Sequence, residues 1–160
     1  MAEIDYVVRE IKLNYSGVLN LKELYGLIRA WLNEKGFFVM EKEHEGSESE
    51  EGDSIRTKFE SFRKVEEYTK YFIKITIKAN FLKETTEQYY YKGDFTVTFE
   101  SWLEKDYENR YENKPLMKFF KGINEKLFEK GRFSKYEDEL RDLTNSVHNE
   151  VKAFLNLTKL

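Results

Sequence analysis

The chain has 160 residues, with 30 acidic and 27 basic side chains and no cysteine. This length is sufficient for one domain with its own core, and the lack of cysteine excludes disulfides, thiolate nucleophiles and zinc ribbons. A formal net charge of −3 excludes a global attraction to nucleic acid or to anionic membranes, so any such binding must be local.

Residues 1–5 lack a basic region followed by an apolar run, and no stretch approaches the roughly 20 apolar residues of a membrane span. We therefore expect a cytoplasmic protein with no transmembrane segment. Its composition predicts a single globular domain over residues 1–160.

The first predicted element is a strand at residues 4–15, which residues 16–17 (Ser-Gly) end. Its apolar side chains change phase along the strand, which predicts a bulge at residues 8–10.

A helix follows this strand. Asn20 and Glu23 form a capping pair at its start, and Gly36 stands where a helix ends. The apolar side chains between them recur at helical spacing and predict one buried stripe. They are Leu21, Leu24, Ile28, Trp31 and Leu32.

Next come a hairpin and its return strand. Residues 37–45 begin apolar and become acidic, and the polar run 46–54 contains two glycines. We expect a mobile acidic hairpin loop at about 46–54, with residues 55–62 as the return strand. The carboxylates of the loop could bind a divalent cation, although glycine and serine suit a solvated hairpin tip better.

Strict alternation over residues 71–81 is the clearest strand pattern, and it predicts the central strand of an antiparallel sheet. One face is apolar and must be covered, whereas the other can meet water or a polar partner. The apolar phase holds Tyr71, Ile73, Ile75, Ile77, Ala79 and Phe81, and the other holds Phe72, Lys74, Thr76, Lys78 and Asn80.

Residues 89–99 supply the last strand region. Gly93 within it is either a bulge in one long strand or a tight turn between two short strands. The sheet therefore has five or six strands.

The C-terminal third predicts two helices. Pro115 precedes an apolar helical stripe at 116–128, and Ser134 with Glu137 forms a capping box that opens a longer helix of roughly 20 residues, or about 30 Å. The basic segment 114–132 could lie on a membrane or a partner protein, but a stripe that completes the core is the simpler interpretation. The stripe of the longer helix holds Tyr136, Leu140, Leu143, Val147, Val151 and Phe154.

Together these elements predict an α+β fold: a single antiparallel sheet, a meander of about five or six strands, with helices covering one face and a long C-terminal helix crossing it. This order of elements is similar to helix-grip folds of the START and polyketide-cyclase type, which hold an apolar ligand between the sheet and the final helix. The additional helix at 116–128 departs from that pattern.

The catalytic signatures GxGxxG, GxSxG, HExxH and the Walker loop are absent, which disfavours an enzyme. His44 and His148 are the only histidines, and we expect them to face solvent rather than bind a metal. The sequence therefore predicts no cofactor, no metal site and no catalytic residue.

Glu60 and Glu100 could form a carboxylate pair on the polar face, but surface glutamates are the simpler interpretation.

The leading functional hypothesis is a non-catalytic, soluble binding or protein-interaction domain, with a protein partner or self-association. The first alternative is a carrier of a small apolar ligand, held between the sheet and the last helix. The expected ligand-binding residues are Ile73, Ile75, Ile77, Phe95, Val97, Phe99, Val147 and Val151.

The second alternative is a protein that binds single-stranded nucleic acid, in which basic side chains contact phosphates and aromatic rings stack on bases. The acidic net charge and the interspersed glutamates make this alternative weaker than a solvated face. The same face could equally contact a protein partner. Its expected residues are Arg56, Lys58, Lys74, Lys78, Tyr89 and Tyr91.

Overall fold

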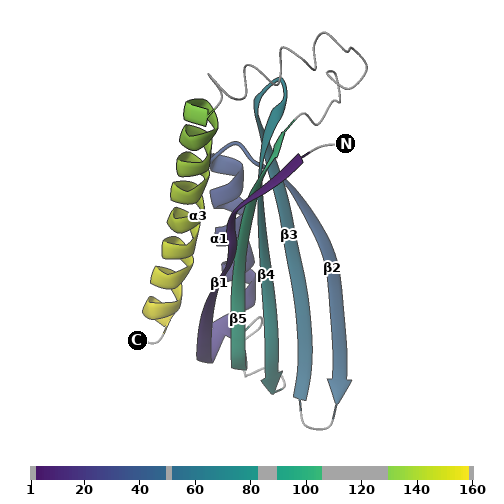
Figure 1. Cartoon of the computed structure of the whole chain (residues 1–160). Helices are drawn as coiled ribbons and strands as arrows, with labels where there is room; N and C mark the ends of the chain where they lie inside the picture. The colour runs from purple at the N-terminus through teal and green to yellow at the C-terminus, as the bar shows by residue number, and fades with distance from the viewer. Residues whose placement is uncertain (1–2, 50–51, 83–89, 106–129, 159–160) are drawn as a thin grey trace.

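The computed structural model describes residues 3–49, 52–82, 90–105 and 130–158. It shows one antiparallel sheet of five strands and two helices, which confirms the α+β prediction (Figure 1). The elements are β1 (Glu3–Asn20), α1 (Leu21–Glu34), β2 (Phe38–Ser49), β3 (Gly52–Glu66), β4 (Thr69–Leu82), β5 (Tyr90–Lys105) and α3 (Lys130–Thr158).

The strand order is β1-β5-β4-β3-β2, so β2 to β5 form a meander and β1 closes beside β5. The alternating strand β4 is the middle strand, as the sequence predicts. Gly93 is neither a turn nor a bulge, because β5 continues through it in register with both neighbours. Five strands, not six, therefore make up the described sheet.

The predicted phase change in β1 is confirmed, since the pairing of β1 with β5 shifts register between Tyr6 and Val8 and again between Val8 and Ile11. The shift turns Tyr6 and Val8 to opposite faces of the sheet. β1 does not end at Gly17, which pairs with Gly93, but runs on to Asn20 and passes directly into α1.

The predicted caps of α1 are confirmed. The side chain of Asn20 accepts a hydrogen bond of 3.1 Å from the backbone N–H of Glu23. At the other end Gly36 has φ 82°, and Phe37 N–H donates to the carbonyl of Leu32 at 2.9 Å, which satisfies a helix-end carbonyl.

The β2–β3 hairpin is longer than the sequence predicts. Residues 46–49 and 52–55 are paired, from Gly46 opposite Ile55 to Ser49 opposite Gly52. Polar side chains are compatible with strands here because main-chain pairing does not require an apolar face. The described strands therefore account for most of the expected loop at 46–54.

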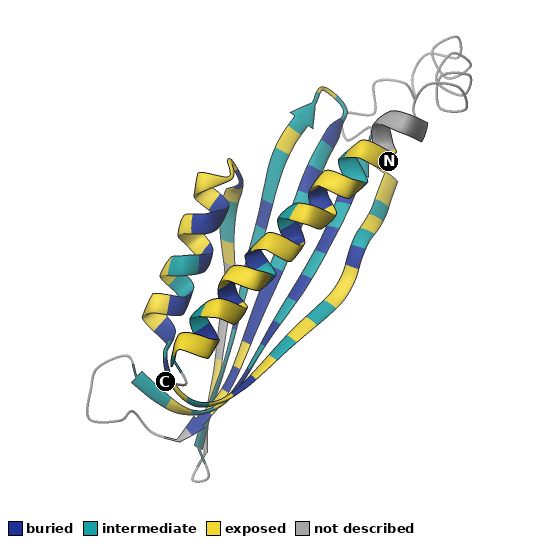
Figure 2. Cartoon of the chain, turned by 90° about the vertical axis from the view of Figure 1, so that its left-hand side faces the viewer, coloured by how far each residue is buried: buried dark blue, intermediate teal, exposed yellow. Residues whose placement is uncertain are grey.

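Both helices lie on the same side of the sheet, and their buried stripes face it (Figures 1 and 2). The start of α3 lies by β3 and β4, where Glu139 pairs with Arg63 and the Tyr136 ring meets the Tyr71 ring. Further along, Thr144 lies 2.9 Å from Ser101 of β5. The last helix therefore crosses the sheet, as predicted.

The start of α3 differs from the prediction. The helix already includes residues 130–133, so Ser134 is not its N-cap and Gly131 does not lie outside it. Once a helix is packed, each added residue extends it at small cost, so a glycine and a capping pattern do not stop it. The predicted helix at 116–128 lies outside the described residues.

Arg63 joins four elements at the end of the core where α3 approaches the sheet. Its guanidinium donates to the carbonyl of Lys35 at 2.8 Å and pairs with Glu139 at 2.7 Å. It also lies over the rings of Phe37 and Tyr71, with 5.3 and 5.1 Å to their centroids. These contacts hold the end of α1, β3, β4 and α3 together.

Gly93 fits where no side chain can. A Cβ there would overlap the carbonyl oxygen of Asn80 and lie 2.6 Å from the Cα of Phe81. We expect Gly93→Ala to lower the free energy of unfolding by about 1–3 kcal/mol, measured by urea denaturation. The matched control is Gly26→Ala in α1, where a Cβ meets nothing within 4 Å. This control should raise the free energy of unfolding by about 0.5–1 kcal/mol. Equal effects of the two changes would contradict the close contact of Gly93 with the backbone of β4.

The phenol of Tyr71 is fully buried. Burial first, and then the nearby Glu139 carboxylate, raise its pKa above the ordinary value of 10.0. The folded state thus keeps its proton above pH 10 while the unfolded state loses it, so stability falls as pH rises. We expect this fall, measured by denaturation between about pH 9 and pH 11, to be shallower in Tyr71→Phe. Identical slopes would show that Tyr71 ionises normally in the folded protein.

Candidate functional site

The face of the sheet turned away from α1 and α3, called the open face here, carries the strand side chains of the polar phase. Thr76, Thr96 and Thr98 lie on it, together with the lysines of β3 and β4 and a set of aromatic rings. Among the described elements no helix covers this face (Figures 1 and 2). It is therefore the sheet face that the two described helices leave uncovered.

Five aromatic side chains, one from each strand, form a continuous row across the open face, called the aromatic row. Strand register places each ring directly opposite the next. Adjacent ring centroids are 5.4 to 5.9 Å apart. In order from β2 to β1 the rings belong to Phe38, Phe62, Phe72, Trp102 and Tyr6.

The ends of the row are open to solvent, since Phe38 is 61% exposed and Tyr6 is 52% exposed. Cations flank the rings: the Arg9 guanidinium lies 5.1 Å from the Tyr6 centroid, and Lys70 Nζ lies 4.8 Å from the Phe62 centroid. Exposed apolar surface with polar neighbours is typical of binding sites. The row is thus the apolar half of a candidate site.

A shallow hollow of about 490 Å³ lies further along the same face, called the cationic hollow. The carboxylates at its edge are each beside a lysine: Glu10 lies 3.0 Å from Lys12, and Glu100 lies 3.8 Å from Lys74. The lining residues are Glu10, Lys12, Asn14, Arg56, Lys74, Thr76, Lys78, Thr96, Thr98 and Glu100.

Arg56 and Lys78 lie opposite each other on β3 and β4, and neither makes an ion pair with a side chain that the structure describes. On its other side Arg56 lies opposite Glu45 of β2 in the strand register. The Nε of Arg56 is buried and makes no hydrogen bond within this part of the chain. Arg56 and Lys78 also line a second hollow of about 410 Å³, which continues toward Ser54 and Asn80. The open face thus holds two adjacent cations that line both hollows.

Four of the predicted nucleic-acid or partner residues, Arg56, Lys58, Lys74 and Lys78, lie together on the open face. Tyr91 does not join them, because it lies on the helix side with its ring centroid 4.6 Å from that of Phe81. Tyr89 lies outside the described residues.

The aromatic row is the part of the site that the sequence analysis missed. Phe62 and Phe72 stand in the polar phase of their strands, which is a visible signal. Their alignment with Phe38, Trp102 and Tyr6 requires the register of four strand pairs, which the pattern of a single strand does not contain.

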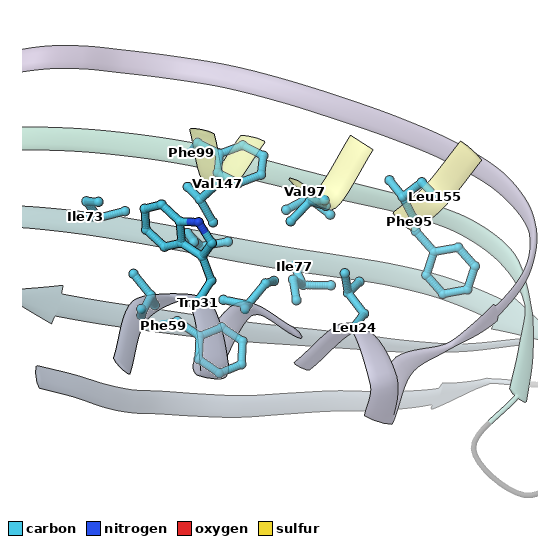
Figure 3. Packing of buried hydrophobic residues seen from close by; sticks show 14 of the residues in the cluster. Leu24, Trp31, Phe59, Ile73, Ile77, Phe95, Val97, Phe99, Val147 and Leu155 are labelled. Atoms are coloured by element: carbon cyan, nitrogen blue, oxygen red, sulfur yellow. The ribbon is translucent and has the colours of Figure 1, made fainter. Parts of the chain in front are cut away.

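Each of the eight residues predicted to bind an apolar ligand is at most 1% exposed. Figure 3 labels Ile73, Ile77, Phe95, Val97, Phe99 and Val147, which pack between the sheet and the helices. Their side chains belong to one continuous cluster with those of Trp31, Phe59 and Leu155. Their role in ligand binding stays a prediction.

The two glutamates considered as a carboxylate pair are not neighbours. Lys74 lies between them, because it pairs with Glu60 on one side and with Glu100 on the other. His148 lies against Phe99, with 5.4 Å between ring centroids. The described part of the chain holds no group of three or more side chains suited to a metal ion.

Among the helices described here, none is both long enough and apolar enough to cross a membrane. Comparison of the chain with models of known protein families, and with curated proteins, gives no match. The geometry of the open face is therefore the basis from which a function is inferred.

The aromatic row should stabilise the sheet as well as form a surface. Phe72 and Trp102 are stacked, with 5° between ring planes and 5.4 Å between centroids. In a double-mutant cycle of Phe72→Thr and Trp102→Thr, measured by urea denaturation, we expect a coupling energy of about 0.5–1.5 kcal/mol. Phe72→Thr combined with Leu157→Ala on α3 is the control and should be additive. Additivity in both cycles would show that the two rings do not interact.

Proposed function

We propose that this protein is a non-catalytic binding protein and that the open face of its sheet is the binding surface. The aromatic row supports this proposal most directly. It brings five rings together on a face that no described helix covers, and the rings at its two ends, Phe38 and Tyr6, are more than half exposed.

The division of the sheet into two faces adds to the argument. The helix side is filled by side chains such as Ile75, Val97 and Leu140, which are fully buried. The open face carries both apolar and charged groups, the combination from which binding surfaces are built. Aromatic side chains at such surfaces contribute a large share of binding energy when a partner covers them.

The described residues of the open face also favour binding over catalysis. The carboxylates Glu10 and Glu100 lie beside lysines, and Lys74 separates Glu60 from Glu100. General acid–base catalysis by two carboxylates requires environments that push their pKa values apart, and this arrangement provides no such pair.

The proposal predicts a companion molecule that depends on the exposed ends of the aromatic row. Native mass spectrometry of the protein, purified gently from its own cells, should show an additional mass that denaturation removes. Tyr6→Ser combined with Phe38→Ser should lose this mass, because both rings are at least half exposed and available to a partner.

The matched control is Ala153→Ser with Leu157→Ser, two exposed positions on α3. This control should keep the companion mass. A wild-type chain that is bare, or a mass that survives the changes at Tyr6 and Phe38, would contradict the proposal. So would a robust enzymatic turnover that one side-chain change abolishes.

A further inference from the structure

We infer that the ligand of the open face is single-stranded nucleic acid, with phosphates bound at Arg56 and Lys78 and bases packed on the aromatic row. This inference rests on the proposed function and specifies its ligand.

The first observation is the pair of adjacent cations. Arg56 and Lys78 are opposite each other in the cationic hollow, and neither makes an ion pair with a side chain that the structure describes, although Glu45 of β2 lies opposite Arg56 in the strand register. Guanidinium and ammonium groups are the side chains that proteins use to bind phosphate.

The second observation is the set of groups around this pair. Thr76 and Thr98 bring hydroxyl groups to the hollow, whereas the Thr96 hydroxyl already donates to Asn14 Oδ1 at 3.1 Å. Hydroxyl side chains contribute hydrogen bonds to phosphate and sugar oxygens in nucleic-acid complexes. The hollow therefore offers both charge and neutral donors to a backbone of phosphates.

The third observation is that the rings and the cations share one face along the same two strands. On β3 the row residue Phe62 lies six positions from Arg56, and on β4 Phe72 lies six positions from Lys78. At the rise of an antiparallel strand this separation is about 20 Å. A strand of several nucleotides could follow this path, which passes Lys74.

A single strand fits these features better than a duplex, because its bases are free to contact aromatic side chains. A protein partner fits less well, since interface centres are depleted in lysine and the cationic hollow is rich in it. The acidic net charge of the chain implies that attraction is local and that few phosphates are contacted. For two phosphates on a single strand, the slope of log K against log salt should be about −1.4.

The test is fluorescence anisotropy of the full chain with a labelled single-stranded oligouridine of about 12 nucleotides, titrated at several salt concentrations between about 50 and 200 mM. Arg56→Gln with Lys78→Gln should weaken binding by at least about 10-fold and remove most of the salt dependence. Tyr6→Ser with Phe38→Ser should weaken binding between about 5-fold and 100-fold while the salt slope is unchanged.

The control is Lys135→Gln with Lys152→Gln, which removes the same charge from two exposed positions on α3. It should leave affinity within about 2-fold, because charges distant from the site are screened. A loss equal to that of the Arg56 and Lys78 changes would show non-specific attraction and overturn the inference. Unchanged affinity in the Arg56 and Lys78 variant would overturn it as well.

The two experiments distinguish a wrong ligand from a wrong binding surface. A wild-type chain that binds no oligonucleotide up to about 10⁻⁴ M, yet carries a companion protein that the changes at Tyr6 and Phe38 remove, would overturn nucleic acid as the ligand and leave the open face as a binding surface. A chain with neither oligonucleotide binding nor a companion would overturn both.

Discussion

The fold depends on covering one face of a five-stranded sheet. The apolar side chains of β4 and β5 cannot remain in water, and α1 and α3 are the described elements that remove them from it. At about 25 cal/mol for each Å² of apolar surface, this burial is the dominant favourable contribution to folding. The opposite face is under no such requirement, so its composition is free to serve another purpose.

The covered face is not purely apolar, and its polar groups show how tightly the two layers are matched. Ser61 is fully buried and donates to the carbonyl of Ile73 at 2.9 Å. Thr144 of α3 lies 2.7 Å from the Leu140 carbonyl and 2.9 Å from the Ser101 hydroxyl. Each short polar side chain has its hydrogen bond within the core, so none requires access to water.

Strand register decides which side chains of neighbouring strands lie side by side on the open face. Side chains alternate with period two, so a slip of one residue would exchange the covered and open faces of a strand. The aromatic row requires four strand pairs to be aligned at once, from Phe38 opposite Phe62 to Tyr6 opposite Trp102. The close passage of β5 against β4 at Gly93 and the bulges of β1 help to set that alignment.

The sequence predicts elements whose cause is local. The alternation of β4, the Asn20 cap and the Gly36 end of α1 all follow from interactions within a few residues, and each is confirmed. The start of α3 is not predicted correctly, because a helix is extended by a further turn at small cost and the capping pattern at Ser134 does not stop it.

The candidate site is less predictable, because its parts come from different strands. The lysines of β3 and β4 are recognisable in single strands, whereas the row is not. The position of Tyr91 could not be predicted for the same reason, since it depends on pairing between strands. Its face is set by unbroken pairing through Gly93, which keeps Tyr91 in phase with the buried Phe95, and glycine alone does not reveal whether a strand continues.

The basic side chains of the open face fall into two groups, those that form an ion pair with a described carboxylate and those that do not. Lys12 and Lys74 lie beside carboxylates, so they add little net field and are adequately explained as solvated surface groups. Arg56 and Lys78 are different, because they lie opposite each other on neighbouring strands, where two cations repel. Glu45 of β2 lies opposite Arg56 on its other side, so the sheet supplies an opposite charge beside one of the two cations. A phosphate in the cationic hollow would lie near both cations, and their mutual repulsion would then be offset by attraction to the ligand.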